Sequence, residues 1–249
     1  MRIGRVLRIA ALVAVVLVVG AIAAIVGVLM YGGPPMKDGA TFADGKVTLV
    51  LGHMGPVRIG AYLIGLADGG YALVDAGIDP KAEAIVAALH RRGAQASDVH
   101  AVFLTHAHDD HFGGARTFRE AKVFALEADA AILRRNGWVV QGVADGEVTT
   151  VGGTKVETFA VPGHTLGSAA YLIDGVLFVG DAAAAISESE LAPNDFAFTV
   201  DVQLNHRSLR ALAARLQPRE AEIGYIAFGH QGPVKSLKPL LKWASENAH

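Results

Sequence analysis

The chain has 249 residues, with 22 Lys and Arg against 24 Asp and Glu, and its formal net charge is −2. This length supplies one large domain or two small ones, and it is enough to build one sizeable core. The balanced charge, without a basic run, excludes the electrostatic footprint of a nucleic-acid-binding protein. The absence of cysteine excludes disulfides and thiolate metal ligands.

The first predicted element is a membrane anchor. An uncharged apolar run from Ile9 to Met30 follows three arginines, at positions 2, 5 and 8. As a helix, about 22 residues span the roughly 30 Å hydrocarbon core of a bilayer. We therefore expect residues 1–8 to be a cytoplasmic basic segment and residues 9–30 a single-pass anchor in the inner or plasma membrane. The positive-inside rule places the rest of the chain, with any catalytic domain, outside the cytoplasm.

A cleaved signal peptide is the alternative, with Ala21-Ile22-Ala23 as its small-residue cleavage site. The apolar run continues past that site, whereas the apolar region of a signal peptide usually has about 7–15 residues. An uncleaved anchor is therefore favoured. The next stretch, residues 31–40, contains Gly-Gly and Pro-Pro pairs and is expected to be a short linker. One domain is expected over residues 41–249.

Short strand-like runs and helical patterns alternate through the front half of this domain. A helix is expected after the third strand, with Asp79 as its N-cap, Pro80 in its first turn and Gly93 as its stop. Two further helices are expected, one after Gly114 and one over residues 127–137. The expected strands cover residues 46–52, 58–66, 71–77, 99–105 and 122–126.

Strands and helices also alternate in the back half, which has a helix around Leu209 and a terminal helix within residues 236–248. Residues 187–203 have no helical or strand period. They are expected to form either a lid or pocket wall that uses Phe196 and Phe198, or a buried loop. Strands in mixed order, interleaved with helices, predict an α/β sandwich rather than a purely parallel fold. The back-half strands are expected at residues 155–161, 169–173, 176–180 and 224–229.

Potential metal ligands follow the ends of four of these strands. Loops at strand ends are where α/β folds build their sites. The densest motif is THAHDDH, at residues 105–111, in which alternate histidines project to one side of an extended segment. With the histidine of a later loop, they can offer three nitrogens to one ion. This first ligand set consists of His106, His108 and His164.

A second ligand set is expected beside the first. If the chain turns into a helix after His108, Asp110 and His111 point to a neighbouring position, where His230 can join them. Asp181 has two carboxylate oxygens and can bridge two ions. Imidazole and carboxylate ligands suit Zn²⁺, so two zinc ions per chain are predicted, with Fe or Mn as alternatives.

Other residues near these motifs have simpler interpretations. Asp109 is expected to be solvated or to support a ligand without binding the metal itself. Three glycines are expected to allow close packing beside the site, where a side chain would intrude. These are Gly113, Gly114 and Gly163. The remaining histidines are interpreted as surface or hydrogen-bonded residues: His53, His90, His100, His206 and His249.

Together these motifs resemble the metallo-β-lactamase superfamily. THAHDDH, PGHTLGS, LFVGD and AFGHQG look like its four ligand motifs, in family order, and LVDAG with Asp75 looks like its N-terminal aspartate turn. The resemblance covers residues 47–233. It implies a four-layer αββα sandwich with a dinuclear site on one edge, and a structural or supporting role for Asp75.

The resemblance also implies a reaction class. Asp181 in the bridging position points away from true β-lactamases and towards glyoxalase II-like thioesterases and lactonases. The helical domain that binds glutathione in glyoxalase II has no room here. We therefore expect a membrane-anchored hydrolase in which a metal-bound hydroxide attacks an ester-like bond, such as a thioester or lactone, of a small-molecule substrate. Asp110 would orient the hydroxide and carry a proton towards the leaving group.

Three alternatives stay open from the sequence. A persulfide dioxygenase-like oxidoreductase with one iron shares these motifs. A non-catalytic binding protein with the same fold would normally have lost ligands, whereas all seven positions here carry a competent side chain. Hydrolysis of phosphodiesters is a further possibility that requires a substrate panel.

Overall fold

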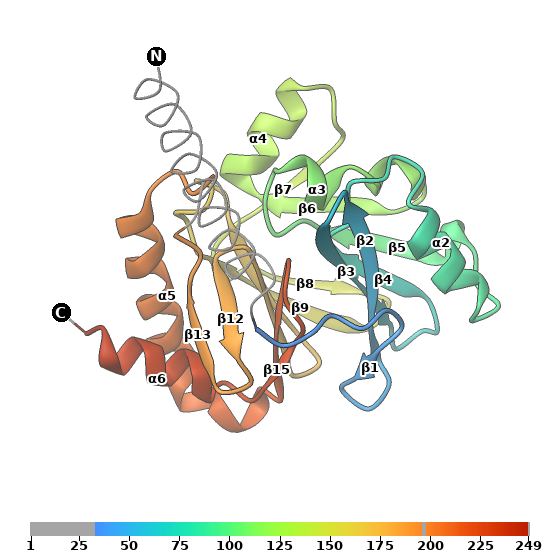
Figure 1. Ribbon diagram of the computed structural model, residues 1–249. Helices are drawn as coiled ribbons and strands as arrows, with labels where there is room; N and C mark the ends of the chain where they lie inside the picture. Colours follow the sequence, from blue (N-terminus) through green and yellow to red (C-terminus); the bar gives the residue numbers. More distant parts are fainter. Residues whose placement is uncertain (1–32, 196–197, 249) are drawn as a thin grey trace, which may run out of the picture. The chain divides into compact units, whose positions relative to one another are not determined.

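The computed structural model describes residues 33–195 and 198–248, so the expected anchor at residues 9–30 lies outside the described part. Gly33–His249 forms one compact unit. Two mixed β-sheets face each other, and helices cover their outer faces (Figure 1). Within the described ranges, no helix is long and apolar enough to cross a membrane.

The first sheet has seven strands that follow one another in sequence order. Its pairing is antiparallel as far as the fourth strand and parallel from there to the seventh. Because β4 and β5 are parallel neighbours, the residues that follow them meet at one edge of the sheet. The strands are β1 (Thr41–Phe42), β2 (Val47–Met54), β3 (Val57–Gly65), β4 (Tyr71–Val74), β5 (Val99–Phe103), β6 (Lys122–Leu126) and β7 (Gln141–Val143).

The second sheet has six strands in the order β15-β14-β11-β10-β9-β8. In it β11 and β14 are parallel neighbours, so the loops after these two strands also share an edge. A separate hairpin, β12 (Ala183–Ser187) with β13 (Glu190–Pro193), follows the second sheet's central strand. The strands of the sheet are β8 (Val148–Val151), β9 (Thr154–Ala160), β10 (Ala169–Ile173), β11 (Val176–Gly180), β14 (Tyr225–Phe228) and β15 (Val234–Lys235).

Three apolar cores separate the four layers. Between the sheets, large aromatic side chains such as Phe103, Tyr171 and Phe178 are fully buried. The outer face of the first sheet packs against α2 (Glu83–His90) and α4 (Glu127–Arg135). The outer face of the second packs against α5 (Val202–Leu216) and α6 (Lys238–Glu246). The expected α/β sandwich of four layers is confirmed for the described residues.

The remaining helices are short. The four-residue helix α3 (Asp109–Phe112) contains the last three residues of the THAHDDH segment and the residue that follows it. The helix expected after Gly114 is only a 3₁₀ turn, η2 (Ala115–Thr117), because the chain must return to β6 within a few residues. The other 3₁₀ segments are η1 (Ala96–Asp98) and η3 (Gln217–Glu222).

The start of α2 differs from the prediction. The structure places the N-cap at Ala82, whose φ of 48° is left-handed, and not at Asp79. The Asp79 carboxylate instead accepts hydrogen bonds from the backbone N–H groups of Lys81 and Glu83. Asp79 therefore closes a turn that precedes the helix, which delays the first helical residue to Glu83.

The stretch 31–40, expected to be a linker, packs against the domain from residue 33 onwards. Met36 is buried in the core between the sheets. Residues 187–203, for which no period was found, contain the strand β13 and then return to the start of α5. They do not form a buried loop, because Phe198 and Val200 are exposed, while Phe196 lies outside the described residues.

Candidate metal centre

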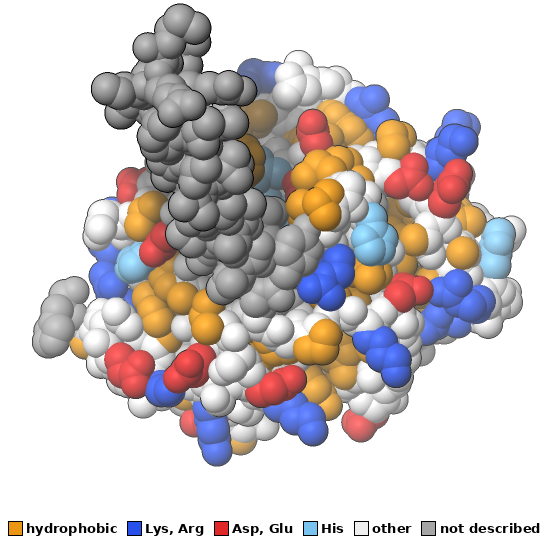
Figure 2. All heavy atoms as spheres, viewed as in Figure 1, with side chains coloured by type: hydrophobic (Ala, Val, Ile, Leu, Met, Phe, Trp, Pro, Cys, Tyr) orange, Lys and Arg blue, Asp and Glu red, His pale blue; other side chains and the backbone are white. Residues whose placement is uncertain are grey.

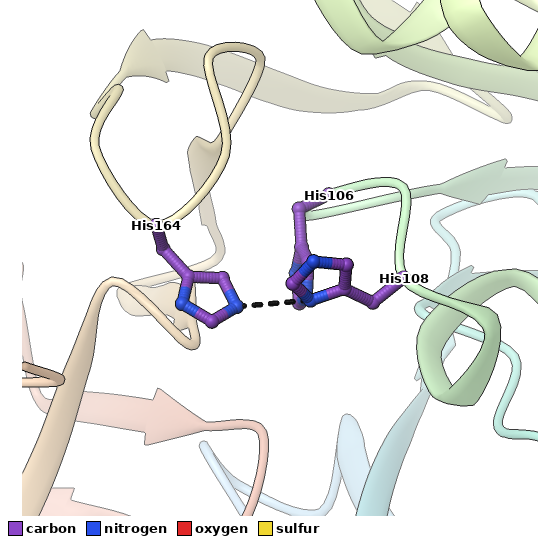
Figure 3. A group of neighbouring side chains, drawn as sticks. All are labelled: His106, His108 and His164. Atoms are coloured by element: carbon purple, nitrogen blue, oxygen red, sulfur yellow. Dashed lines mark hydrogen bonds between the residues drawn. The ribbon is translucent and has the colours of Figure 1, made fainter. Parts of the chain in front are cut away.

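All seven predicted ligands lie together at one edge of the sandwich. His106 and His108 follow β5, and α3 adds Asp110 and His111. The other three come from the loops after β9, β11 and β14 of the second sheet. Figure 3 shows His164, on one loop, directing its imidazole towards His106 and His108 on another. The predicted meeting of these strand ends is therefore present in the structure.

The first ligand set is a cluster of three imidazoles. The Nε2 atoms of His106 and His164 lie 3.0 Å and 3.1 Å from Nδ1 of His108. The Thr105 hydroxyl donates to Asp75, so it accepts from Nδ1 of His106. The Thr199 hydroxyl likewise donates to a backbone carbonyl and accepts from Nδ1 of His164. Both tautomers leave Nε2 bare and facing the cluster.

The second set combines one carboxylate with two imidazoles. Asp110 Oδ2 lies 3.7 Å from His111 Nε2 and 3.4 Å from His230 Nε2. His230 donates its Nδ1–H to the carbonyl oxygen of Arg58 at 2.7 Å. His111 directs Nδ1 to Asp75 Oδ2 at 2.8 Å. These outer partners turn both Nε2 atoms towards Asp110, as outer hydrogen bonds commonly do for metal-binding histidines.

Asp181 lies between the two sets. Its Oδ2 is 3.1 Å from His230 Nε2 and 3.8 Å from His164 Nε2, so one oxygen faces a member of each set. Its Oδ1 is 3.6 Å from His111 Nε2. His106, His111 and Asp181 also form a compact group of potential ligands. This position is the one expected of a bridging carboxylate.

The donor atoms fit metal ions. Nitrogens bound tetrahedrally to zinc at about 2.0–2.1 Å stand roughly 3.3 Å apart, close to the separations in the first set. Three bare nitrogens at that distance repel one another unless a cation or protons lie between them. In the second set, His111 Nε2 is buried and has no hydrogen-bond partner. A cation would satisfy this atom together with the surrounding carboxylates.

The electrostatics of the two sets differ. Burial lowers the pKa of His106 well below its usual range and lowers the pKa of His164 to about 4, which favours neutral imidazoles in the first set. Burial would also lower the pKa of His111, but the carboxylates of Asp181 and Asp75 outweigh it and raise that pKa well above the ordinary value. The second set therefore attracts positive charge.

Asp75 supports both sets, in agreement with the role that the family resemblance implied. Its carboxylate is buried, and its Oδ1 accepts the backbone N–H of Thr105 at 2.8 Å. Its Oδ2 accepts the Thr105 hydroxyl and faces His111 Nδ1. One side chain thus orients a histidine of each set, through Thr105 to His106 and directly to His111.

Asp129, in the first turn of α4, is a supporting residue that the sequence did not reveal. Its fully buried Oδ2 accepts the backbone N–H of Ala107 at 2.7 Å and the hydroxyl of Thr165 at 2.8 Å. It therefore ties the loop of His106 and His108 to the loop of His164. The nearest sequence signal is its place beside the apolar positions of an amphipathic helix, which predicts burial but no partner.

Close packing by glycine is confirmed at the three predicted positions. A Cβ at Gly114 would lie 2.3 Å from the carbonyl oxygen of Ala76, and one at Gly113 would lie 2.6 Å from that of Ile78. Gly163 combines a φ of +143° with a close approach to the backbone of Asn205. Gly229 was not predicted, although its absent side chain leaves the space that the Asp181 carboxylate fills.

The described residues that were not proposed as ligands stay outside the cluster, while His249 lies outside the described residues. Asp109 is exposed. His206 pairs with Asp195, and His100 lies near Asp68. On the face shown in Figure 2, acidic and basic side chains are interspersed over the surface.

Comparison with known proteins gives a family match and two groups of relatives. The model of the metallo-beta-lactamase superfamily matches residues 54–230. A hydroxyacylglutathione hydrolase from Rhodopseudomonas palustris is 37% identical over 120 residues, which cover 46% of this chain and 44% of the relative. One from Acidiphilium cryptum is 36% identical over 126 residues, covering 45% and 44%. The matches thus span less than half the length of these curated relatives.

Solved structures share the fold. A metallo-beta-lactamase family protein from Thermus thermophilus has a TM-score of 0.61 and 24% identity, covering 81% of this chain and 78% of that one. A mutant flavo di-iron protein from Thermotoga maritima has a TM-score of 0.57 and 19% identity, covering 76% and 53%. At these identities the likeness concerns the fold alone.

Proposed function

The chain belongs to the metallo-beta-lactamase superfamily, and on this premise we propose that it is a membrane-anchored, metal-dependent hydrolase of ester-like bonds. Thioesters are the first substrate class to consider, because the similar curated proteins are named hydroxyacylglutathione hydrolases. Lactones and related esters follow, since their carbonyl carbon is open to the same attack by water.

The observation that carries this proposal is the sharing of Asp181 between two ligand sets. His106, His108 and His164 would hold one ion, and Asp110, His111 and His230 a second, with an oxygen of Asp181 facing members of both sets. Zinc is the proposed metal for both positions. When bound, such ions act as Lewis acids and lower the pKa of a coordinated water to about 7.

The chain's own side chains would then direct the proton transfers. Asp110 is the proposed catalytic residue, because its carboxylate is part-exposed at the cluster while the imidazoles of His106 and His111 are fully buried. A carboxylate in this position can accept a hydrogen bond from the attacking water and pass a proton to the leaving group. Asp75 and Asp129 have a different role, because they fix the positions of the loops that carry the proposed ligands.

Two measurements test the hydrolase. The full chain, purified in detergent without added metal or chelator, should contain about two zinc ions by elemental analysis, and it should cleave members of a panel of thioesters, lactones, β-lactams and phosphodiesters. About one iron per chain, with oxygen consumption, would instead favour the oxidoreductase. Asp110→Ala should abolish turnover without unfolding the protein, while the adjacent exposed Asp109→Ala serves as the matched control.

Membrane attachment is supported by the sequence of residues 9–30 and needs its own test. The full chain should remain in the membrane fraction after an alkaline carbonate wash, whereas a chain beginning at Gly33 should be released. Protease added to spheroplasts, in which the inner membrane is intact, should digest the domain if it is extracytoplasmic. Protection from the protease would contradict the proposed topology.

A further inference from the structure

Large apolar side chains are exposed around the metal centre. Two of them, Phe198 and Val200, lie on the segment that leads into α5, and Leu166 lies on the loop of His164. A fourth, Met54, lies at the end of β2. Exposed apolar groups scattered singly are ordinary, but a group beside a functional site marks a binding surface. The exposed large apolar residues of the described part are Met54, Ile132, Val139, Val148, Leu166, Ile186, Phe198 and Val200.

Three members of this group lie on segments that contact or carry residues of the first ligand set. The Phe198 ring is 79% exposed and its centroid lies 6.4 Å from that of His108. The backbone N–H of Val200 donates to the carbonyl oxygen of His164 at 3.1 Å. Leu166 follows His164 by two residues. The Phe198 ring therefore lies beside an imidazole of the first set, and the exposed side chains of Val200 and Leu166 lie on segments that bond to or carry His164.

The fourth member of the group lies on a hairpin that contacts the second ligand set. The backbone N–H of Gly60, in β3, donates to the carbonyl oxygen of Gly229 at 2.8 Å, and Arg58 accepts the hydrogen bond from His230. Met54 is paired with Val57 where the β2–β3 hairpin turns, just beyond Arg58. The four exposed residues Met54, Leu166, Phe198 and Val200 thus belong to segments that carry or contact the ligand residues, and together we call them the apolar rim.

The start of the described chain lies close to the same loops. The carbonyl oxygen of Pro34 accepts the backbone N–H of Gly232, two residues after the ligand His230. The apolar sequence run ends at Met30, three residues before Gly33. Three residues of extended chain reach at most about 11 Å. If that run lies in a bilayer, the domain is attached to a surface at which amphiphilic molecules concentrate.

We propose that the apolar rim binds the acyl chain of an amphiphilic ester or thioester, so that the enzyme prefers medium or long acyl chains. This inference rests on the proposed hydrolase and names its substrate class. Water adds its oxygen to the acyl carbon, the C–S or C–O bond breaks, and the thiol or alcohol leaves with a proton as the carboxylic acid forms. The polar end of the substrate stays in water.

Chain length provides the test. Each methylene removed completely from water strengthens binding by up to about 4-fold. With the metal-loaded full chain in detergent, kcat/KM should therefore rise at least tenfold from an acetyl to an octanoyl thioester of the same thiol, each below its critical micelle concentration. Phe198→Ala and Val200→Ser should each remove most of this increase, so that the ratio of octanoyl to acetyl kcat/KM falls towards one. Val139→Ser, at a 92% exposed position that is not part of the rim, is the matched control.

Failure of the rim and failure of the hydrolase give different results. Equal kcat/KM for all chain lengths, or an octanoyl preference that survives Phe198→Ala combined with Val200→Ser, would overturn the rim while leaving the hydrolase intact. If no ester is cleaved, calorimetry with an octanoyl thioether analogue tests directly whether the rim binds an acyl chain. Binding that is lost in the double variant would support the rim without hydrolysis, and no binding would overturn it.

Discussion

Asp75 Oδ2 lies 2.8 Å from His111 Nδ1, and both side chains are almost completely buried. This contact fixes the imidazole so that Nε2, which has no hydrogen-bond partner, faces Asp110 and Asp181. Through Thr105 the same carboxylate also orients His106. Asp75 thus acts on both ligand sets without being within either.

The first prediction concerns Asp75→Asn. Asparagine has the shape of aspartate and tolerates the left-handed φ of 58° at this position. The fold should persist. The asparagine amide, however, has one acceptor oxygen and cannot replace both oxygens of the carboxylate. Zinc affinity should fall about 10- to 100-fold, as for other outer partners of metal-binding histidines. Competition with a chelator measures this, and the exposed Asp68→Asn should leave the affinity unchanged. Unchanged affinity in Asp75→Asn would refute the orienting role.

The second prediction concerns the space at Gly229. A methyl group there would lie 2.1 Å from Asp181 Oδ1 and 2.7 Å from His111 Cε1. Gly229→Ala should therefore displace the bridging carboxylate and lower zinc occupancy, besides destabilising the domain by about 1–3 kcal/mol through overpacking. Gly224→Ala is the control, since its Cβ would come no closer than 3.8 Å to other atoms. Normal occupancy in Gly229→Ala would contradict the placement of Asp181.

The third prediction concerns Asp129. Replacement by alanine leaves the Ala107 N–H without its acceptor, whereas the Thr165 hydroxyl can donate to Ser168 Oγ, 2.9 Å away. A buried donor left unsatisfied costs about 1–3 kcal/mol, so the free energy of unfolding should fall by about 1–3 kcal/mol. Denaturant titration of both variants would compare this with Glu127→Ala, an exposed acidic residue of the same helix turn, expected to change it by less than about 0.5 kcal/mol. Equal effects would exclude a tethering role.

The sequence predicts which seven side chains lie together because the signal is local. Three histidines and two aspartates within six residues are costly to bury without a partner, and strand ends carry the rest. Asp129 escapes prediction because its partner Thr165 is 36 residues away. An acidic residue in the first turn of a helix is also common on a surface, where its charge interacts favourably with the helix dipole. Only the packing of α4 against the His164 loop distinguishes the two cases.

The elements missed by the sequence have a physical reason as well. The edge strands β7 and β8 are three and four residues long, and β8 has no fully buried residue, so neither shows an apolar period. The hairpin β12–β13 is small and contains alanines that fit any secondary structure. Interior strands such as β10 and β11 are buried throughout and were predicted with their observed bounds.

The fourth prediction concerns the shared carboxylate. In Asp181→Asn the oxygen that faces His164 and His230 loses its negative charge, so the carboxylate between the two sets no longer offsets the repulsion between two neighbouring divalent ions. Zinc content should fall from about two ions per chain towards one, since His106, His108 and His164 remain a complete set of three nitrogens. Elemental analysis after dialysis measures this, with Asp109→Asn as the exposed control. Two tightly held ions in Asp181→Asn would show that each set binds its metal independently, and a bridging role for Asp181 would then be wrong.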